Sequence, residues 1–317
     1  MTQNLTFRLA QSSDFDEILK LSEGIHNGGD YLPSRFHKWM KMENLYVMLA
    51  FSGKKIVSLV VSSVVDEGMT VVDRAGRTLP ELRGRGILTQ LIQVMHAFVR
   101  EKHPTVRRRR FTRFKNRVLG AKWKTLVQRE KLCCYVETAT LRSQQIVTTN
   151  LVEIQSCPKD YLFDVLFSPP VGQKLFPDNI IVVDSGFVIE PLRSNIDFLM
   201  QEIGDSVYFA VEKRPDDALL RSVSFGVVSC RVKFTRWTAS IYSSDPVLYQ
   251  SHLVHQLKRA CDVIKHGFVF LSYHEQGLTN CGRRALKELW KIEIDEAKTK
   301  EFEYLFEEKM PVHHSRI

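Results

Sequence analysis

The feature that most constrains the fold is a stretch in which an apolar strand pattern, a glycine-containing basic turn and an amphipathic helix follow one another. Met69–Val72 is apolar, and Arg83-Gly84-Arg85-Gly86 follows Pro80. From Leu88 onward, apolar residues recur every three or four positions as far as Val99, which places them on one face of a helix. The stretch therefore predicts a strand, a tight turn and a helix in direct succession.

The glycine-containing turn has the properties of an anion site. Gly84 and Gly86 lack a Cβ atom, so their backbone N–H groups can come close to a ligand. The start of the helix adds unpaired N–H donors and a partial positive charge, and Arg83 and Arg85 add two full charges. We interpret the turn as a binding site for phosphate groups. An ordinary basic turn is the open alternative.

A second stretch, Leu21–Met40, reads LSEGIHNGGDYLPSRFHKWM. Together with the glycine turn it resembles the vertebrate histidine N-acetyltransferases of the GNAT superfamily, which carry a G-I-x-x-G-x-D-Y-L-P-S-R-[FY]-H-x-W segment. The matching residues are Gly24, Ile25, Gly28, Asp30, Tyr31, Leu32, Pro33, Ser34, Arg35, Phe36, His37 and Trp39. A weaker likeness continues through Leu166–Gly186 to the C-terminus.

The order of predicted elements in the first half fits the layout that this resemblance implies. Residues 4–9 read as a strand, a capped helix follows from residue 12, and a second short helix opens at Pro33. Tyr46–Phe51 and Ile56–Val65 read as a hairpin turned at Ser52-Gly53-Lys54. After the long helix we predict a strand at 106–115, a helix at 118–123, and strands at 125–128 and 132–138.

The second half is predicted to have a similar order of elements to the first, with weaker sequence motifs. Ser224–Val232 and Arg236–Tyr242 read as paired strands, followed by a helix that runs to Gly267 and a buried strand at Phe268–Tyr273. A further helix is predicted at 285–290. No glycine-rich turn precedes the first of these helices. We therefore predict an α/β fold with a mixed sheet: a GNAT domain at 1–145, a connector at 146–164, and a degenerate GNAT-like domain at 165–317 without a coenzyme A loop.

Composition limits the class of protein and its partners. The net charge is +9, which suits a polyanionic ligand such as coenzyme A but also nucleic acid or an anionic membrane. No apolar run approaches the roughly 20 residues that cross a bilayer, and no secretory signal is visible. The six cysteines form no C-x-x-C pair. We expect a cytoplasmic protein with reduced thiols, no metal, and neither membrane nor nucleic acid as a partner.

The resemblance implies a set of residues that bind acetyl-coenzyme A as co-substrate. The splayed strand before the turn would supply backbone N–H groups to the thioester carbonyl. The predicted contacts are Gly76, Arg77, Thr78, Leu79, Arg83, Gly84, Arg85, Gly86, Ile87, Leu88 and Asn116. Two positions depart from the family: Leu88 stands where Gly or Ala is usual, and Trp123 stands where a tyrosine usually protonates the leaving thiolate.

The acceptor amine needs a base and a place to bind. An amino group is mostly protonated at neutral pH, and Asp73 is the acid on the strand that carries the base in this superfamily. Pairing of Asp73 with Arg74 at a solvent-facing edge is the alternative. For substrate binding the resemblance points to Asp30, Tyr31, Arg35 and His37. Arg35 suits a carboxylate held by two hydrogen bonds, unless it pairs with Asp30 to hold the loop.

The run Arg107–Arg110 leaves several interpretations open. It fits a contact to the coenzyme A 3′-phosphate, a nuclear signal, an RNA-binding patch, or a solvated basic strand.

We expect an N-acetyltransferase that moves the acetyl group of acetyl-coenzyme A to the α-amine of a free amino acid, histidine by resemblance. The alternatives are a GNAT enzyme that acts on another small amine or a protein N-terminus, and a non-catalytic module that binds coenzyme A or RNA. The residues leave open the oligomeric state and which amine is acetylated.

Overall fold

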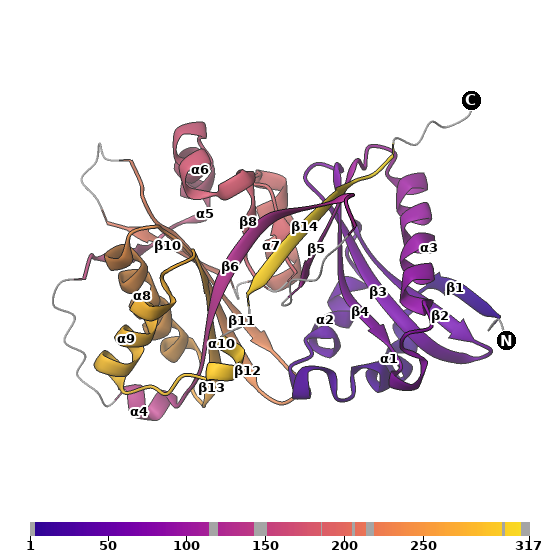
Figure 1. Cartoon of the computed structure of the whole chain (residues 1–317), viewed down its shortest axis with the longest axis horizontal. Coiled ribbons are helices and arrows are strands. Elements are labelled where there is room, and N and C mark those ends of the chain that lie inside the picture. The colour runs from indigo at the N-terminus through magenta and orange to yellow at the C-terminus, as the bar shows by residue number, and fades with distance from the viewer. Residues whose placement is uncertain are drawn as a thin grey trace.

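The structure, a computed structural model, describes residues 4–113, 120–142, 151–184, 186–204, 207–213, 219–299 and 302–311. Its strands form a mixed sheet of 12 strands and a separate sheet of two. Two halves with a similar order of elements lie side by side along the large sheet, the N-terminal half on the right of Figure 1 and the C-terminal half on the left. No helix in the described ranges is long and apolar enough to span a bilayer.

The first half contains the strand, turn and helix that the sequence predicts. Its antiparallel strands are β1 (Leu5–Leu9), β2 (Leu45–Ser52), β3 (Lys55–Val65) and β4 (Thr70–Thr78). Its helices are α1 (Phe15–Ser22), α2 (Leu32–Trp39) and α3 (Ile87–Lys102), and α3 leads from β4 to β5 (Arg108–Arg113). The buried face of α3 includes Leu91, Met95 and Val99, so the predicted helix period is confirmed.

The second half repeats this order. Its elements are β7 (Ile154–Ser156), β10 (Val207–Glu212), β11 (Val223–Cys230), β12 (Thr235–Tyr242), α8 (Pro246–Val263), β13 (Phe268–His274) and α9 (Thr279–Trp290). The predicted series of two strands, helix, strand and helix is confirmed. Residues 154–156 differ from the prediction of an unpatterned connector, because β7 pairs with β10 and forms the far edge of the sheet.

Shorter elements fill the space between the two halves and at their ends. They are α4 (Thr138–Arg142), α5 (Lys159–Tyr161), η4 (Leu162–Leu166), α6 (Pro169–Leu175), β8 (Ile181–Val182), β9 (Val188–Ile189), α7 (Arg193–Ile203) and α10 (Glu296–Thr299). Helix α7 contacts both α2 and β3 of the first half. One apolar cluster contains Val65 and Val72 of the first half together with Phe187 and Leu199 of the second. The two halves therefore share a core as well as a sheet.

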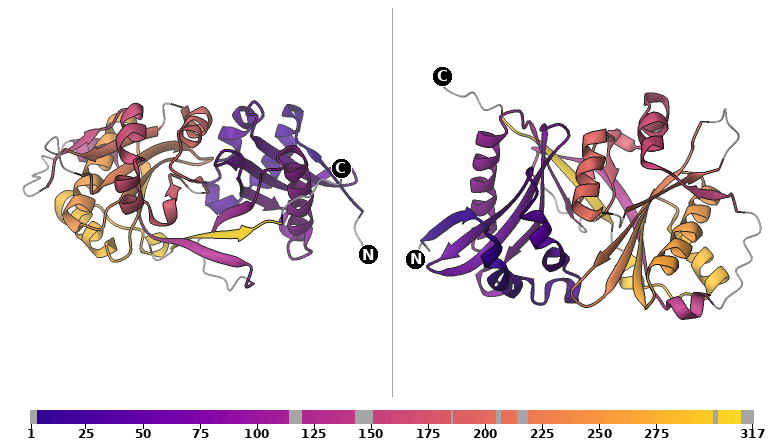
Figure 2. Two further views of the ribbon diagram at one scale, coloured as in Figure 1. Left: turned by 90° about the horizontal axis from the view of Figure 1, so that it is seen from above. Right: turned by 180° about the vertical axis from the view of Figure 1, so that it is seen from behind.

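Two strands cross from one half to the other. The first part of β6 (Trp123–Val136) pairs with β14 (Glu303–Lys309), and its second part pairs with β13. The last strand, β14, lies between β5 and β6, so the sheet order is β1-β2-β3-β4-β5-β14-β6-β13-β12-β11-β10-β7. Figures 1 and 2 show both strands reaching across the middle of the molecule. The strands of both halves thus form one sheet, joined through β6 and β14. The predicted boundary between residues 145 and 165 therefore divides the sequence but not the sheet.

The prediction of two separate strands at 125–128 and 132–138 is wrong, because β6 is continuous. No glycine or proline interrupts residues 123–136, and partner strands are available along the whole length. The helix predicted at 118–123 lies mostly outside the described residues. Trp123 itself begins β6, and its ring packs edge-on against Phe111 with the ring centroids 4.7 Å apart.

The arginine run Arg107–Arg110 holds the crossing strand in place. Arg110 Nε donates to Glu307 at 2.7 Å, and Arg109 Nη1 donates to Glu308 at 3.1 Å. Further ion-pair partners of the run are Asp66, Asp73 and Glu190. Arg109 and Arg110 therefore help to fix β14 against β5, and the interpretation as a solvated basic strand is wrong for them, whereas a contact of the run to a phosphate or to RNA stays a prediction.

Candidate active site

The start of α3 forms an open basic turn at the surface. Gly84 and Gly86 have φ angles of 78° and 75°, and a Cβ atom at either position would meet no atom within 4 Å. Gly86 is the N-cap residue, and no side chain caps the helix. Arg83 and Arg85 are exposed beside it. The unpaired N–H groups, the helix dipole and the two charges together can bind a phosphate group.

The corresponding helix of the second half begins differently. The side chain of Asp245 accepts hydrogen bonds from Val247 N at 2.8 Å and Leu248 N at 3.2 Å, and Pro246 occupies the first helical turn. A carboxylate thus already satisfies the donors at the start of α8 and would repel a phosphate. The two helices therefore differ in their capacity to bind an anion.

The departure at Leu88 is accommodated by packing. A Cβ atom on Gly76 would lie 3.1 Å from Leu88 Cδ2, and Leu88 is half-buried against the core of the first half. The leucine side chain therefore lies over β4 rather than over the glycine turn.

A slot opens between the two parallel strands of the first half. β4 and β5 pair only through Thr70–Val72 and residues 108–110, although β4 continues to Thr78 and β5 to Arg113. A register shift opposite β3 and a φ of 53° at Ala75 bend β4 in this region. In the second half, β12 and β13 stay paired over five residues. Within the described chain, the parallel strands diverge only in the first half.

A cavity of about 740 Å³ lies where this slot meets the second half. Residues of β4 and β5 and the loop before α2 line one side, and residues of β6, β12 and β13 line the other. Its charged lining residues are Asp73, Arg74, Arg77, Arg113, Lys131, Arg231, Arg236 and Lys298. Among the described residues, seven cationic side chains and one carboxylate thus line the cavity, and Arg74, Arg77 and Arg236 pair with carboxylates behind the lining.

The segment at 24–39 joins the two halves of the protein. The hairpin between β11 and β12 docks on it through the backbone, because Val232 N donates to Asp30 O at 3.2 Å and Lys233 N donates to Gly28 O at 3.0 Å. Gly28 has a φ of 93°, and a Cβ atom there would lie 2.4 Å from the Lys233 side chain. The backbone geometry and the close approach both explain a glycine at this position.

Arg35 lies in an ion-pair network between the halves instead of lining the cavity. Its Nη2 donates to Asp184 Oδ2 at 2.9 Å, and its Nη1 lies 3.4 Å from Glu202 Oε1. Arg74 donates to the same Glu202 at 2.5 and 2.8 Å, and Trp39 Nε1 donates to it at 3.0 Å. The geometry gives Arg35 a bridging position between the halves, and the alternative pairing with Asp30 does not occur.

The other predicted acceptor residues have three different environments. Asp30 is buried, pairs with Arg77 Nη2 at 2.6 Å, and accepts from Leu32 N at 3.0 Å. Its pKa lies below the ordinary value, because the bonds to Arg77 outweigh the effect of burial, which alone would raise it. Tyr31 lines the cavity. His37 is exposed on α2 and packs against Phe15, away from the cavity lining.

Asp73 lines the cavity, but its carboxylate is already well bonded. It accepts from Ser62 Oγ at 2.6 Å and Arg109 Nε at 2.6 Å, and His96 Nε2 lies 2.9 Å from Oδ2. Burial alone would raise the pKa of Asp73, yet the bond to His96 and the charges of His96 and Arg109 hold it below its ordinary value. The expected pairing with Arg74 is wrong, because Arg74 pairs with Glu202.

The remaining predicted cofactor residues lie along the end of β4 and the turn. Thr78 Oγ1 contacts Ser58 Oγ at 2.9 Å, and the Leu79 N–H donates to Val57 O at 3.0 Å, so this N–H is already used. Arg83 Nε donates to Thr78 O at 3.2 Å. Ile87, the first residue of α3, is buried. Asn116 lies outside the described residues.

The second half supplies cavity residues that the sequence analysis missed. Arg231 and Arg236 flank the hairpin between β11 and β12, and Leu271 and Tyr273 come from β13. The basic pair at the two ends of a short hairpin was visible in the sequence. Nothing in the local pattern indicated that this hairpin meets residues 28–34, because that contact joins segments about 200 residues apart.

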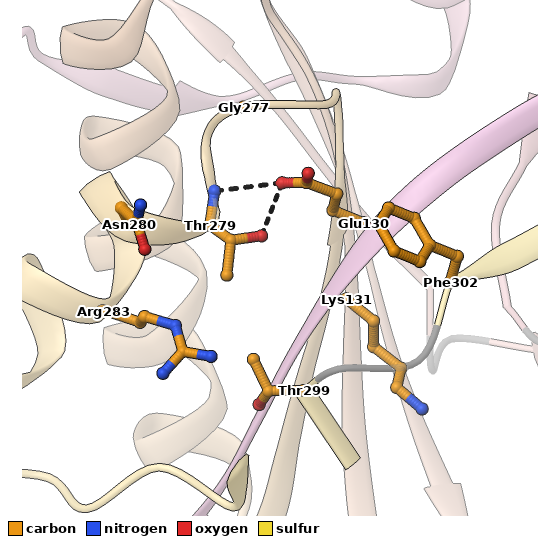
Figure 3. Close-up of a pocket in the computed structure, with 8 residues that line it drawn as sticks. All are labelled: Glu130, Lys131, Gly277, Thr279, Asn280, Arg283, Thr299 and Phe302. Atoms are coloured by element: carbon orange, nitrogen blue, oxygen red, sulfur yellow. Dashed lines mark hydrogen bonds between the residues drawn. The ribbon is translucent and has the colours of Figure 1, made fainter. Parts of the chain in front are cut away.

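A smaller cavity of about 300 Å³ lies within the second half (Figure 3). The carboxylate of Glu130 lies at the start of α9, where it accepts hydrogen bonds from Thr279 N at 3.2 Å and Thr279 Oγ1 at 2.6 Å. Arg283, across this cavity, pairs with Glu296. Glu130 and Arg283 are thus already bonded to protein groups, unlike the open turn at α3.

The fold matches solved structures of tandem acetyltransferase architecture. A tandem GNAT protein from the clavulanic acid biosynthesis pathway superposes over 98% of this chain and 100% of its own with a TM-score of 0.60 at 10% identity. A GCN5-related N-acetyltransferase from Sphaerobacter thermophilus covers 96% of this chain and 95% of its own with a TM-score of 0.58 at 12% identity. At such identities the likeness establishes the fold, which is the tandem GNAT fold.

Sequence comparison narrows this class. The family described as "Histidine N-acetyltransferase, C-terminal" matches residues 152–275. The histidine N-acetyltransferase of Scomber australasicus is 37% identical over 109 residues, which cover 34% of this chain and 32% of that protein. The one from Xenopus tropicalis is 37% identical over 107 residues, 34% and 33% of the two chains. The matched part thus spans about a third of these relatives. The chain thus has the tandem GNAT fold and is similar, over part of its length, to the histidine N-acetyltransferases.

Proposed function

We propose that this protein is an N-acetyltransferase that moves the acetyl group of acetyl-coenzyme A to the α-amine of a free amino acid, with L-histidine as the first substrate to test. The observation that carries the proposal is the combination of the open α3 turn, the slot between β4 and β5, and the cavity that residues of both strands line. The relation to proteins named histidine N-acetyltransferase directs the choice of amino acid.

The open turn at α3 fits the pyrophosphate of coenzyme A. Gly84 and Gly86 leave room for close approach of the phosphates, and Arg83 and Arg85 add positive charge. The slot between β4 and β5 would take the pantetheine arm, where edge N–H groups of β4 have no strand partner among the described residues. Acetyl-coenzyme A supplies the thioester, and the chain's part is to hold it with its carbonyl near such donors.

The cavity fits a small zwitterionic acceptor. Its volume of about 740 Å³ is ample for an amino acid, and the cationic side chains in its lining include suitable partners for a carboxylate. Binding in this cavity would orient the amine toward the end of the slot, and holding two reactants in place lowers the barrier of a bimolecular step.

For the proton of the amine we propose Asp73, acting through water. It is the one acidic side chain among the described residues that line the cavity. Its lowered pKa keeps it ionised, so it can stabilise the ammonium group and receive the proton during transfer. With Trp123 packed on Phe111, we propose that the thiolate leaves without a tyrosine acid. Replacing Asp73 by Asn should lower kcat for histidine while coenzyme A affinity, measured by calorimetry, stays near the native value; an unchanged kcat would exclude this role.

Two other functions remain to be tested alongside this one. A GNAT enzyme that acts on another small amine or on a protein N-terminus would use the same slot. A non-catalytic module would bind coenzyme A without transfer. The cavity between the two halves has a volume of about 740 Å³, which suits a small acceptor, and the peptide in the assay below tests the polypeptide alternative.

The test is thiol release from acetyl-coenzyme A in the presence of purified protein and a panel of free amino acids, other small amines and a short peptide. Mass spectrometry identifies the acetylated product. We expect histidine to give the highest kcat/KM and N-acetylhistidine as the product. Preference for the peptide would support the second function, and binding of coenzyme A without thiol release would support the third.

A further inference from the structure

Arg231 reaches the cavity from the hairpin of the second half, and its position is fixed from several directions. Its own N–H donates to Phe234 O at 2.8 Å, which closes the hairpin. The next two residues donate backbone hydrogen bonds to Asp30 and Gly28 of the first half. The side chain is almost completely buried yet lines the cavity. A guanidinium held in this way is preorganised for a ligand.

The anionic partners of Arg231 are shared with other arginines. Asp184 receives Arg236 Nη2 at 2.7 Å and Arg35 Nη2 at 2.9 Å, whereas Arg231 Nη2 lies 3.5 Å away. No described group accepts a hydrogen bond from Arg231 Nε. Its guanidinium therefore has the weakest contact of the three to this shared carboxylate, and an unpaired buried N–H group is costly.

The electrostatic surroundings agree with this geometry. Burial, and then the charge of Arg236, lower the pKa of Arg231 to about 9 from the ordinary value of 12.5. The charge of Arg231 is thus poorly compensated in the protein alone. An anion placed against it would both satisfy the open N–H group and offset the unfavourable charge.

We propose that Arg231 binds the α-carboxylate of the acceptor amino acid. The inference rests on the proposed function and deepens it, because it assigns recognition of the acceptor to the second half of the chain. Tyr31 forms the neighbouring wall, with its ring centre 5.0 Å from the Arg231 guanidinium carbon. The first half then holds the acyl donor, and the hairpin between β11 and β12 holds the acceptor. Arg35, whose guanidinium already contacts two carboxylates, serves to join the halves.

The test compares substrates that differ only in the carboxylate. L-Histidine and histamine are assayed by thiol release with the full-length protein, and with the variants Arg231→Gln and Arg231→Lys. Loss of a buried charge-assisted bond should raise the KM for histidine about 100-fold in Arg231→Gln, with little change for histamine. Arg231→Lys keeps the charge but loses the planar fork, so its KM for histidine should rise less.

Lys233→Gln is the matched control. It removes one positive charge from the same hairpin, but Lys233 is exposed and does not line the cavity. Its KM for histidine should stay within about twofold of the native value, as expected for a surface charge. Coenzyme A affinity, measured by calorimetry, establishes that each variant is folded. A native enzyme that treats histidine and histamine alike, or an Arg231→Gln variant that loses both equally, would overturn the proposal.

A binding measurement separates this inference from the proposed function. The native protein is titrated with N-acetyl-L-histidine and with N-acetylhistamine, which lacks the carboxylate. Tighter binding of the first ligand, abolished in Arg231→Gln, supports the carboxylate site even if no acetyl transfer occurs, in which case the proposed function alone fails. Equal binding of both ligands, or binding of neither, would contradict the role of Arg231.

Discussion

Arg35 Nη2 donates to Asp184 Oδ2 at 2.9 Å, and this bond joins two residues 149 positions apart in the sequence. Asp184 follows β8 in the second half, and Arg35 lies on α2 in the first. The bond places the most recognisable sequence segment of the chain at the junction between the halves. The segment therefore shapes the cavity by holding its two walls together.

Removing Arg35 should destabilise the fold. Arg35→Ala leaves Asp184 and Glu202 buried with one cation fewer, which should lower the free energy of unfolding by about 3–5 kcal/mol. Urea denaturation measures the change. Arg8→Ala is the control, because the Arg8–Asp14 pair at 2.7 Å has a half-exposed arginine and should contribute about 1 kcal/mol or less. Equal, small losses in both variants would argue against a joining role for Arg35.

Replacing Gly86 should abolish coenzyme A binding without unfolding the protein. A valine side chain would meet open space, but it would stand in front of the free N–H groups of α3 and would strain a backbone with a φ of 75°. Calorimetric titration with coenzyme A measures the affinity. Gly53→Val is a matched control, since Gly53 also has a positive φ and open surroundings but lies in the hairpin between β2 and β3. If Gly86→Val retained the native affinity, the turn would not be the phosphate site.

A related prediction concerns Leu88, which follows the glycine turn in the sequence. Leu88→Gly should not weaken binding of coenzyme A, because the leucine packs on Gly76 instead of contacting the turn. The same titration measures it. A marked loss of affinity in this variant would mean that Leu88 packing sets the position of α3.

One molecule of coenzyme A should bind per chain. The turn at α3 is open, whereas Asp245 caps α8 and β12 stays paired with β13. A titration followed by calorimetry should give a stoichiometry of one, and Gly86→Val should remove it completely. Two equivalent sites would mean that the second half also holds a nucleotide, which its capped helix start argues against.

Glu303 should make stability fall with rising pH. Burial, and then the charge of Asp184, raise the pKa of this carboxyl to about 7 from 4.5. Between these values the folded state binds more protons than the unfolded state, so the free energy of unfolding decreases as pH rises from about 4.5 to about 7. Glu303→Gln removes this loss. It should be more stable than the native protein by up to about 3 kcal/mol at pH 8, with little difference near pH 4.5.

Chemical denaturation of both proteins across this pH range measures the effect of Glu303. Glu288→Gln, an exposed change of the same type on α9, is the control and should show no pH-dependent difference. A constant difference between Glu303→Gln and the native protein at all pH values would exclude titration of Glu303 as the cause.

The local sequence determined the elements of the fold and the open glycine turn before α3. The strand and helix periods at residues 69–99 depend only on which side chains recur every two or every 3.6 positions. The positive φ angles at Gly84 and Gly86 likewise follow from the absence of a Cβ atom. These features are set within a few residues, so the strand, the turn, the helix and their repeat in the second half were predictable.

The tertiary structure alone decided the partners of the charged residues and the path of the last strand. Arg35, Arg74 and Arg77 each had several acids available, and the fold assigns Asp30 to Arg77 and Glu202 to Arg74. Contacts such as Arg35–Asp184 require the second half to lie against α2, which no local pattern specifies. Ion pairs of this kind have no sequence period. The cavity, lined by residues of both halves, therefore exists only in the folded chain.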